Sequence, residues 1–439
     1  MPERSRATHT SYRSPYRPAA VRVLNRLGLM LDGVRPRRRL TEESLLEQAR
    51  RRHGLSDFGE QSFRLPLRVL LDSVESEAHL TPVGRWITRK RLLGMLGNRL
   101  RAEKLFREHP EIGEIEIEPP IVITGMQRTG TTLLHRLLAA DPDTRALLSW
   151  EAINPAPLTS GRAGGENLHG NQDPYGKENL RPQKDPRLRL ARLSQKVLAY
   201  LAPDFFAIHP VEARAPEEDV LLLDYSFLST VPEATLRVPS YARWLESQDL
   251  LPAYRYMKKL LQLLHWQRPG KRWVLKSPHH LEYLDTLFSV FPRAKIIQTH
   301  RDPSVTLASF CSMIAHGRGV FSDSVDPCEI GRDWSRKVRR LVRKAMETRE
   351  RVGEDRFLDV YFHNLLRDPM REIERIYEFI DLPLMGETRR SLEAALRVNG
   401  RHRYGYHRYR LEDFGLSPAG VEARFAEYRR RFNIPAERL

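Results

Sequence analysis

Residues 120–142 constrain the fold of this chain more than any other stretch. They open on Ile121-Val122-Ile123, a β-branched run that is typical of a buried parallel strand. A loop with Gly125 and Gly130 follows, and leucines then recur at helical spacing. A strand, a glycine loop and a helix in this order aim backbone N–H groups at an anion. The alternative is an ordinary tight turn, in which the glycines only permit the backbone conformation.

The spacing of the loop is that of a phosphate loop, G-x-x-x-x-G-x-T, with one change. A nucleotide triphosphatase needs a lysine after the second glycine to reach the β- and γ-phosphates, and this chain has Thr131 there. The nearby cation is Arg128, before Gly130. The loop is therefore expected to hold a phosphate group without the lysine that serves a polyphosphate tail. A kinase that acts on a small molecule is the alternative function for such a loop. A kinase needs an aspartate to hold Mg²⁺, and no clear candidate accompanies the loop.

Charge and composition limit the class of protein. The chain has 439 residues and a net charge of +17, and its hydrophobic content of 41% is that of a globular protein. The charge favours acidic ligands, nucleic acid or an anionic membrane surface, with a merely solvated basic surface as the alternative. Because arginine is spread along the whole chain, we expect no specific nucleic-acid domain. Peripheral contact with anionic membranes remains compatible with the charge.

The sequence offers little sign of disulfide bonds, metal sites, membrane spans or a secretory signal. Its two cysteines exclude a disulfide framework and a four-cysteine zinc site, and we expect no metal. No apolar run is long enough for a transmembrane helix, and the basic N-terminus lacks the apolar core of a secretory signal. We therefore expect a cytoplasmic protein whose residues 1–20 lack fixed structure.

The rest of the chain divides into two regions. Residues 21–117 are predicted to form a helical N-terminal region, and residues 118–439 an α/β domain. In the second region, short apolar runs at 145–151, 272–276, 295–300 and 356–362 alternate with helical patterns. This alternation predicts the α/β class, with a P-loop-like, doubly wound parallel sheet flanked by helices. Residues 155–185 are rich in Pro, Gly and Asn and are predicted to be a long loop.

Three predicted strand ends carry polar residues that belong together. They are the loop at 124–132, Lys276 with Ser277, and Arg301 followed by Ser309 on the next helix. In parallel sheets, ligands bind outside the carboxyl ends of the strands. From residue 118 to the C-terminus, the chain resembles the bacterial branch of the sulfotransferases that use 3′-phosphoadenosine-5′-phosphosulfate (PAPS). Residues 125–132 are similar to that family's 5′-phosphosulfate loop, and residues 298–303 with Ser309 to its 3′-phosphate motif.

This resemblance implies a role for each motif residue in binding PAPS as co-substrate. The 5′-phosphosulfate would be held by Arg128, Thr129, Gly130, Thr131 and Thr132. The 3′-phosphate would be held by Arg301 and Ser309, and Arg403 in the tail would close over the nucleotide. Arg128 and Lys276 would stabilise charge during transfer. Sulfuryl transfer, like phosphoryl transfer, depends mainly on positioning and charge stabilisation, and two side-chain cations make a metal unnecessary.

The acceptor also needs a general base, and several residues are candidates. Glu151 is the first choice, because it falls at a predicted strand end and resembles the glutamate of several sulfotransferase branches. His279 and His280 are the next candidates, followed by Glu217 in the acidic pair with Glu218. The structural alternatives are that Glu151 forms an ion pair with an arginine and that His279 caps its helix.

The sequence leaves the acceptor open. We expect a hydroxyl or amine on a small molecule, a lipid or a carbohydrate, in a pocket built by the N-terminal helices and residues 155–185. The oligomeric state is equally open. A second rival is a non-catalytic protein of the same fold that binds anions or membranes through its charge.

Overall fold

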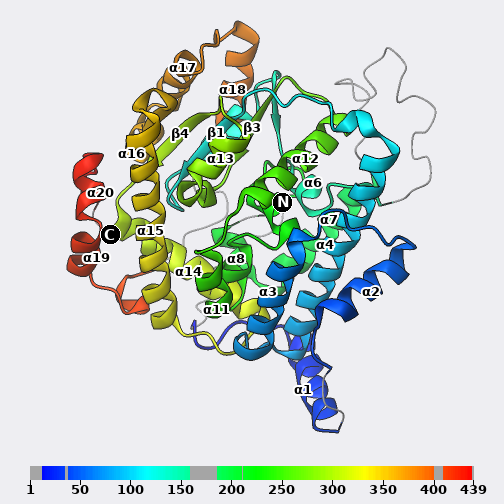
Figure 1. Ribbon diagram of the computed structural model, residues 1–439. Helices are drawn as coiled ribbons and strands as arrows, with labels where there is room; N and C mark the ends of the chain where they lie inside the picture. Colours follow the sequence, from blue (N-terminus) through cyan, green and yellow to red (C-terminus); the bar gives the residue numbers. More distant parts are fainter. Residues whose placement is uncertain (1–11, 35–37, 159–184, 210, 400–408, 438–439) are drawn as a thin grey trace.

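A parallel sheet lies among helices in the upper part of the view in Figure 1. The computed structural model describes residues 12–34, 38–158, 185–209, 211–399 and 409–437. Within these ranges the sheet has five strands in the order β2-β3-β1-β4-β5. The strands are β1 (Ile121–Gly125), β2 (Thr144–Ala146), β3 (Arg272–Lys276), β4 (Lys295–His300) and β5 (Phe357–Tyr361). The predicted parallel α/β sheet is therefore confirmed.

The position of β1 explains why distant motifs meet. It lies between β3 and β4, with Ile123 opposite Lys276 on one side and Gly125 opposite Thr299 on the other. From β1 the chain moves toward one edge to β2, whereas from β4 it moves toward the other edge to β5. A reversal of this kind leaves a crevice at the carboxyl ends of the strands beside it. The glycine loop, Lys276 and Arg301 therefore share one end of the sheet.

Alternation along the strands supplies a core on each face of the sheet. Ile121 and Ile123 belong to the core on one face, with helices α5 (Thr131–Leu138), α17 (Pro369–Phe379) and α18 (Gly386–Val398). Val122 belongs to the larger core on the other face, with α12 (Leu251–Gln267), α13 (Leu284–Val290), α14 (Pro303–Phe321) and α15 (Pro327–Val352). Since successive strand residues point to opposite faces, an unbroken apolar strand needs helices on both. The sheet is doubly wound, as predicted.

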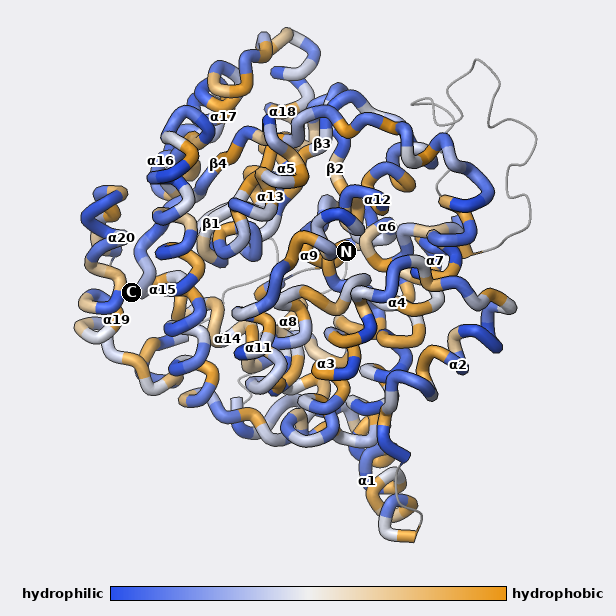
Figure 2. Tube along the Cα trace, viewed as in Figure 1, coloured by the Kyte–Doolittle hydropathy of each residue, from blue (hydrophilic) through white to orange (hydrophobic). Residues whose placement is uncertain are grey.

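The N-terminal helices share the larger core instead of forming one of their own. They are α1 (Ala19–Val34), α2 (Glu42–His53), α3 (Arg64–Glu77) and α4 (Pro82–Glu108). Leu45 of α2 and Leu96 of α4 are buried in the same cluster as Leu260 of α12. Helix α1 projects beyond the other elements and carries apolar residues on its projecting end (Figure 2). The predicted helical region is thus packed onto the α/β part of the chain.

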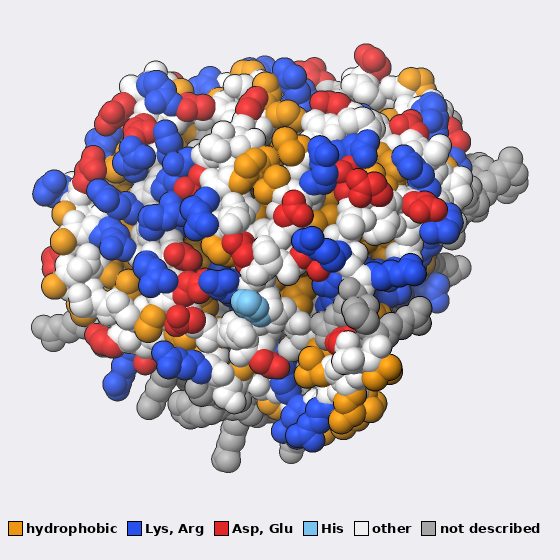
Figure 3. All heavy atoms as spheres, turned by 60° about the horizontal axis from the view of Figure 1, so that its bottom comes forward, with side chains coloured by type: hydrophobic (Ala, Val, Ile, Leu, Met, Phe, Trp, Pro, Cys, Tyr) orange, Lys and Arg blue, Asp and Glu red, His pale blue; other side chains and the backbone are white. Residues whose placement is uncertain are grey.

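The remaining α-helices lie between these elements or follow them. They are α6 (Ser149–Ile153), α7 (Pro186–Leu201), α8 (Pro203–Ile208), α9 (Val220–Leu223), α10 (Val231–Thr235), α11 (Pro239–Leu245), α16 (Phe362–Arg367), α19 (Pro418–Arg424) and α20 (Ala426–Arg431). Basic and acidic side chains are interspersed over the face shown in Figure 3. Among the helices of the described ranges, none combines the length and the apolar character needed to cross a membrane.

Two sequence predictions need correction. Residues 12–18 belong to the first twenty, yet they are held in place: the Tyr12 hydroxyl lies 2.9 Å from Ser312 Oγ, and Arg17 donates to the Ser322 carbonyl. The apolar run at 145–151 is not one strand, because β2 ends at Ala146 and α6 begins at Ser149. The expected loop at 155–185 falls almost entirely outside the described residues, as does Arg403.

Candidate active site

The glycine loop after β1 is fixed from within the protein. A Cβ at Gly125 would clash with Thr299 Oγ1 of β4, and Gly130 has a φ of 90°, so both positions favour glycine. The Thr129 hydroxyl lies 2.6 Å from both the Met126 carbonyl oxygen and Thr299 Oγ1. Helix α5 begins directly after the loop, so its first N–H groups face this end of the sheet. Because the Thr129 hydroxyl is already hydrogen-bonded within the protein, we expect Thr129 to contact a ligand through its backbone N–H only.

Arg128 joins the two motifs that the sequence singled out. Its Nε donates to Ser309 Oγ of α14 at 3.1 Å, and its Nη1 donates to the Ile208 carbonyl at 3.2 Å. The side chain keeps solvent access but is surrounded by protein, and this desolvation lowers the pKa of its guanidinium below the ordinary value. The predicted sulfate-side cation and the predicted 3′-phosphate hydroxyl are therefore in direct contact.

Arg301 lies directly after β4 and is held on three sides. Its Nη1 donates to the Arg128 carbonyl at 3.1 Å, its Nη2 pairs with Glu437 at 3.0 Å, and its guanidinium lies 3.9 Å from the centre of the Phe362 ring. Asp302 caps α14 by accepting a hydrogen bond from the Ser304 N–H. Arg301 is placed with Arg128 at one edge, as the sequence predicts.

Lys276 ends β3 and supplies a further cation at this end of the sheet. Its side chain is buried, and its Nζ lies 2.7 Å from Glu218 Oε1. Glu218 in turn lines a cavity, so the buried Lys276 lies directly behind a residue of the cavity wall.

A cavity of about 310 Å³ adjoins the glycine loop. Its polar wall includes Gln127, Arg128, Thr131, Thr132, His209, Glu217, Glu218, Thr230, Ser277 and His279. The remaining wall is mostly apolar, and half of its apolar residues come from α8, α10 and α14: Phe205, Val231, Ala234, Phe310, Met313 and Ile314. Cavities of this composition bind apolar molecules that carry a few polar groups. No sequence signal had singled out His209 or the apolar wall, since these residues come from segments that lie far apart in the sequence.

The two neighbouring histidines differ in their surroundings. His280 is buried away from the cavity wall, with its Nε2 2.8 Å from Asp219 Oδ1 and its Nδ1 2.8 Å from the Tyr254 hydroxyl. His279 lines the cavity, and its Nδ1 lies 3.3 Å from Thr230 Oγ1. Among the described residues, its buried Nε2 has no hydrogen-bond partner. Burial lowers the pKa of His279 well below its ordinary value, so its ring is neutral at neutral pH.

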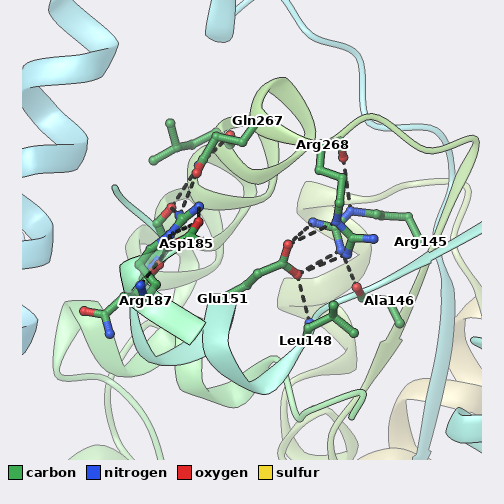
Figure 4. A network of polar contacts seen from close by, with 11 residues as sticks. Arg145, Ala146, Leu148, Glu151, Asp185, Arg187, Gln267 and Arg268 are labelled. Atoms are coloured by element: carbon green, nitrogen blue, oxygen red, sulfur yellow. Dashed lines mark hydrogen bonds and ion pairs between the residues drawn. The ribbon is translucent and has the colours of Figure 1, made fainter. Parts of the chain in front are cut away.

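Glu151, the expected base, lies in a different environment (Figure 4). Its oxygens accept hydrogen bonds from both Nη atoms of Arg145 at 2.8 and 2.9 Å, from Arg268 Nε at 3.2 Å and from the Leu148 N–H at 3.0 Å. Burial would raise its pKa, but the charges of Arg145 and Arg268 outweigh burial and lower the pKa to about 2. The Leu148 bond also explains the start of α6, because a glutamate at this position caps a helix.

This placement corrects the first choice of base. Glu151 is 2% exposed and is not among the residues that line the cavity. A carboxylate with a pKa of about 2 is also a weak proton acceptor at neutral pH. The alternative that the sequence left open, a buried ion pair with an arginine, describes Glu151 in the structure. Of the other candidates, His279 and Glu217 line the cavity, whereas His280 does not.

The fold and the motif geometry agree with one protein family. A profile of the sulfotransferase family matches residues 119–386, so this chain belongs to the sulfotransferase family. The resemblance expected from the motifs is thereby confirmed.

Solved and curated relatives support this assignment. Sulfotransferase STF9 from Mycobacterium avium shares 32% identity and a TM-score of 0.79, over 90% of this chain and 98% of that one. Sulfotransferase STF1 from Mycobacterium tuberculosis H37Rv shares 34% identity and a TM-score of 0.75, over 89% and 99%. A Mycobacterium bovis protein named omega-hydroxy-beta-dihydromenaquinone-9 sulfotransferase Stf3 is 28% identical over 60% of this chain. That match spans 63% of the curated relative's length.

Proposed function

We propose that this chain transfers the sulfuryl group of PAPS to a hydroxyl or amine group on an apolar acceptor. The observation that carries the proposal is the contact between the two anion motifs beside an apolar cavity. Arg128 donates to Ser309, and Arg301 donates to the Arg128 carbonyl. The family membership supports PAPS as the donor.

The residues at this end of the sheet fit such a nucleotide. The loop N–H groups and the start of α5 suit a 5′-phosphosulfate, and Arg301 with Ser309 suits a separate 3′-phosphate. Arg128 and Lys276 would face the charge that develops on transfer, in a partly enclosed site where such contacts are strong. When bound, PAPS supplies a sulfuryl group on a phosphate leaving group. No step in this scheme requires a metal.

His279 is the best-supported general base in the described cavity. Its Nε2 carries a lone pair if Nδ1 holds the proton that is donated to Thr230 Oγ1. Because burial lowers the pKa of His279, its ring is neutral at neutral pH and can accept a proton from the acceptor group. Glu217 is the second candidate, since its carboxylate also lines the cavity.

The apolar wall of the cavity favours a lipid or another apolar acceptor over a carbohydrate. A sugar would leave hydroxyl groups without partners against residues such as Phe310 and Ile314, and this costs free energy. A curated relative is named for a menaquinone derivative, which is a lipid with a terminal hydroxyl. A cytoplasmic location for the reaction stays a prediction.

Calorimetry with 3′-phosphoadenosine-5′-phosphate tests the proposal directly. The intact protein should bind this product, and Arg301→Ala should weaken binding at least tenfold by removing a charged phosphate contact. Arg293→Ala is the control, because Arg293 is an exposed arginine that pairs with Glu116. Binding should be unchanged in this control.

The outcome also separates the rival functions. Absence of nucleotide binding by the intact protein would overturn the proposal. ATP consumption that depends on Mg²⁺ would instead support the small-molecule kinase. Nucleotide binding without transfer to any of a panel of lipid, phenol, amine and sugar acceptors would support a non-catalytic protein of this fold.

A further inference from the structure

Helix α1 turns an apolar face to solvent. Six of its side chains fall within about one third of the helix circumference, at about 100° per residue. They are 52–87% exposed, and we call them the α1 apolar face: Val23, Leu24, Leu27, Met30, Leu31 and Val34. Large apolar side chains that are exposed singly need no explanation, but a continuous exposed patch marks an interaction surface.

The opposite side of α1 fixes this orientation. Asn25 is buried there, and its Oδ1 accepts a hydrogen bond from the Val83 N–H at the start of α4 at 3.0 Å. Gly28 lies so close to Pro82 that a Cβ would clash with the proline ring. The helix therefore packs through Val21, Asn25 and Gly28 and leaves its leucines outside. This is the reverse of an ordinary surface helix, in which the apolar face covers the core.

Basic residues border the α1 apolar face. By helical spacing, Arg22 and Arg26 lie between the apolar face and the side that packs on the protein, and both are exposed. Exposed Arg38 and Arg39 follow the helix in sequence. Figure 3, which turns this end of the molecule forward, shows hydrophobic atoms on a projection beside basic side chains. Leucine and methionine on one side with arginine on the flank is the pattern of a helix that lies in a membrane interface.

We propose that α1 docks the protein on an anionic phospholipid surface. The choice of partner rests on charge complementarity, since the flanking arginines and the net charge of +17 both favour an anionic surface. The convex shape of a projecting single helix also suits insertion among lipid headgroups (Figure 1). A second copy of this chain is the alternative occupant, and the test below separates the two.

The docking helix is connected to the wall of the cavity. The segment before α1 crosses α14, where Tyr12 contacts Ser312 and Arg17 donates to the Ser322 carbonyl. Helix α14 carries Phe310 and Met313 of the apolar wall. Docking would therefore bring the cavity near a lipid surface that can supply an apolar acceptor. This last step rests on the proposed function, whereas membrane docking itself does not.

Sedimentation with vesicles tests the proposal. The full chain should bind vesicles of mixed phosphatidylglycerol and phosphatidylcholine, and high salt should weaken this binding. Binding to vesicles of phosphatidylcholine alone should be weak. Leu27→Glu with Leu31→Glu should reduce binding at least tenfold. Met385→Glu with Val398→Glu is the matched control, because these side chains are similarly exposed but lie outside α1. It should bind as the wild type does.

Two further measurements make the result decisive. Light scattering should show the same mass for the wild type and for the α1 variant. A wild-type dimer that the α1 variant breaks, without vesicle binding, would assign the face to a second copy and overturn the proposal. Equal vesicle binding by wild type and variant would overturn it as well. Nucleotide binding by calorimetry should be unchanged in the variant, so a failure of docking is distinct from a failure of the proposed function.

Discussion

Two clusters of carboxylates and cations lie at the ends of neighbouring strands and differ in how completely they are satisfied. Glu151, after β2, is buried and accepts hydrogen bonds from two arginines and a backbone N–H. Among the described residues, the Glu218 carboxylate has one ion-pair partner, Lys276 of β3, and it also lines a cavity. A carboxylate whose oxygens are all bonded inside the protein stabilises the fold, whereas one that borders a cavity can respond to a ligand. The number of hydrogen-bonding partners and the contact with a cavity therefore distinguish a structural carboxylate from one that can act on a ligand. Position at the end of a strand does not distinguish them.

The largest effect is expected at Lys276. Lys276→Met keeps the length of the side chain but removes the charge, so sulfuryl transfer should fall about 1,000-fold. Turnover with labelled PAPS measures this loss, and thermal unfolding shows whether the fold is retained. Lys271→Met is the control, because Lys271 pairs with Asp143 on the surface and should be neutral. Near-normal turnover in Lys276→Met would remove this lysine from the transfer step.

Glu151 should give the opposite result, with a loss of stability and intact chemistry. Glu151→Gln leaves Arg145 buried without its counter-charge, which should cost about 3 kcal/mol in the free energy of unfolding. Urea unfolding measures this cost, with the exposed Glu116→Gln as control. Turnover of the folded variant should stay within a few-fold of the wild type. A much larger loss of turnover would return Glu151 to the role of base.

The pH dependence of the same variant sharpens the comparison. The pKa of Glu151 is about 2 in the folded protein, against an ordinary value of 4.5. The unfolded chain therefore binds the proton first as the pH falls, so this stability is full above pH 4.5 and is lost toward pH 2. The free energy of unfolding of Glu151→Gln should therefore fall less between pH 4.5 and pH 2 than that of the wild type, as urea unfolding at each pH measures.

His279 should show an intermediate effect on rate. His279→Asn should lower turnover about 100-fold, the usual contribution of a general base. Because burial lowers the pKa of His279, the wild type should keep its activity below pH 6.5 and lose it only as the ring is protonated. This acidic limb should disappear from the pH profile of kcat/KM in His279→Asn. If Glu217→Gln loses the rate and the acidic limb instead, Glu217 is the base.

The smallest effect concerns Glu437, which pairs with Arg301. Glu437→Gln removes a carboxylate that would compete with a bound phosphate, so nucleotide affinity should rise about threefold. Titration calorimetry with 3′-phosphoadenosine-5′-phosphate measures the change. Weaker binding in this variant would mean that Glu437 holds Arg301 in its binding position.

Local sequence patterns predicted the sheet well. The apolar strands β3 and β4 match their predicted ranges, because each is a short buried run with a clear boundary. Arg128, Lys276 and Arg301 were predicted at one site because the carboxyl ends of parallel strands share an edge. The roles of Ser309 and Arg301 came from the family resemblance, and their placement beside Arg128 agrees with it.

Long-range contacts could not be predicted in the same way. Glu151 meets Arg268 from 117 residues along the chain, and the Thr129 hydroxyl meets Thr299 from 170 residues away. No local pattern states that these partners will use up the hydrogen-bonding capacity of the two side chains. The apolar wall of the cavity could not be predicted for the same reason, since α8, α10 and α14 each contribute only a few of its residues.

The bonds of Arg128 also couple the two ends of the proposed nucleotide. Arg301 donates to the Arg128 carbonyl while Arg128 donates to Ser309, so a phosphate that moved Arg301 or Ser309 would also move the cation beside the cavity. Binding energy from a remote group can in this way be spent on orientation at the reacting centre. A donor without its 3′-phosphate would then be a slow substrate as well as a weak one.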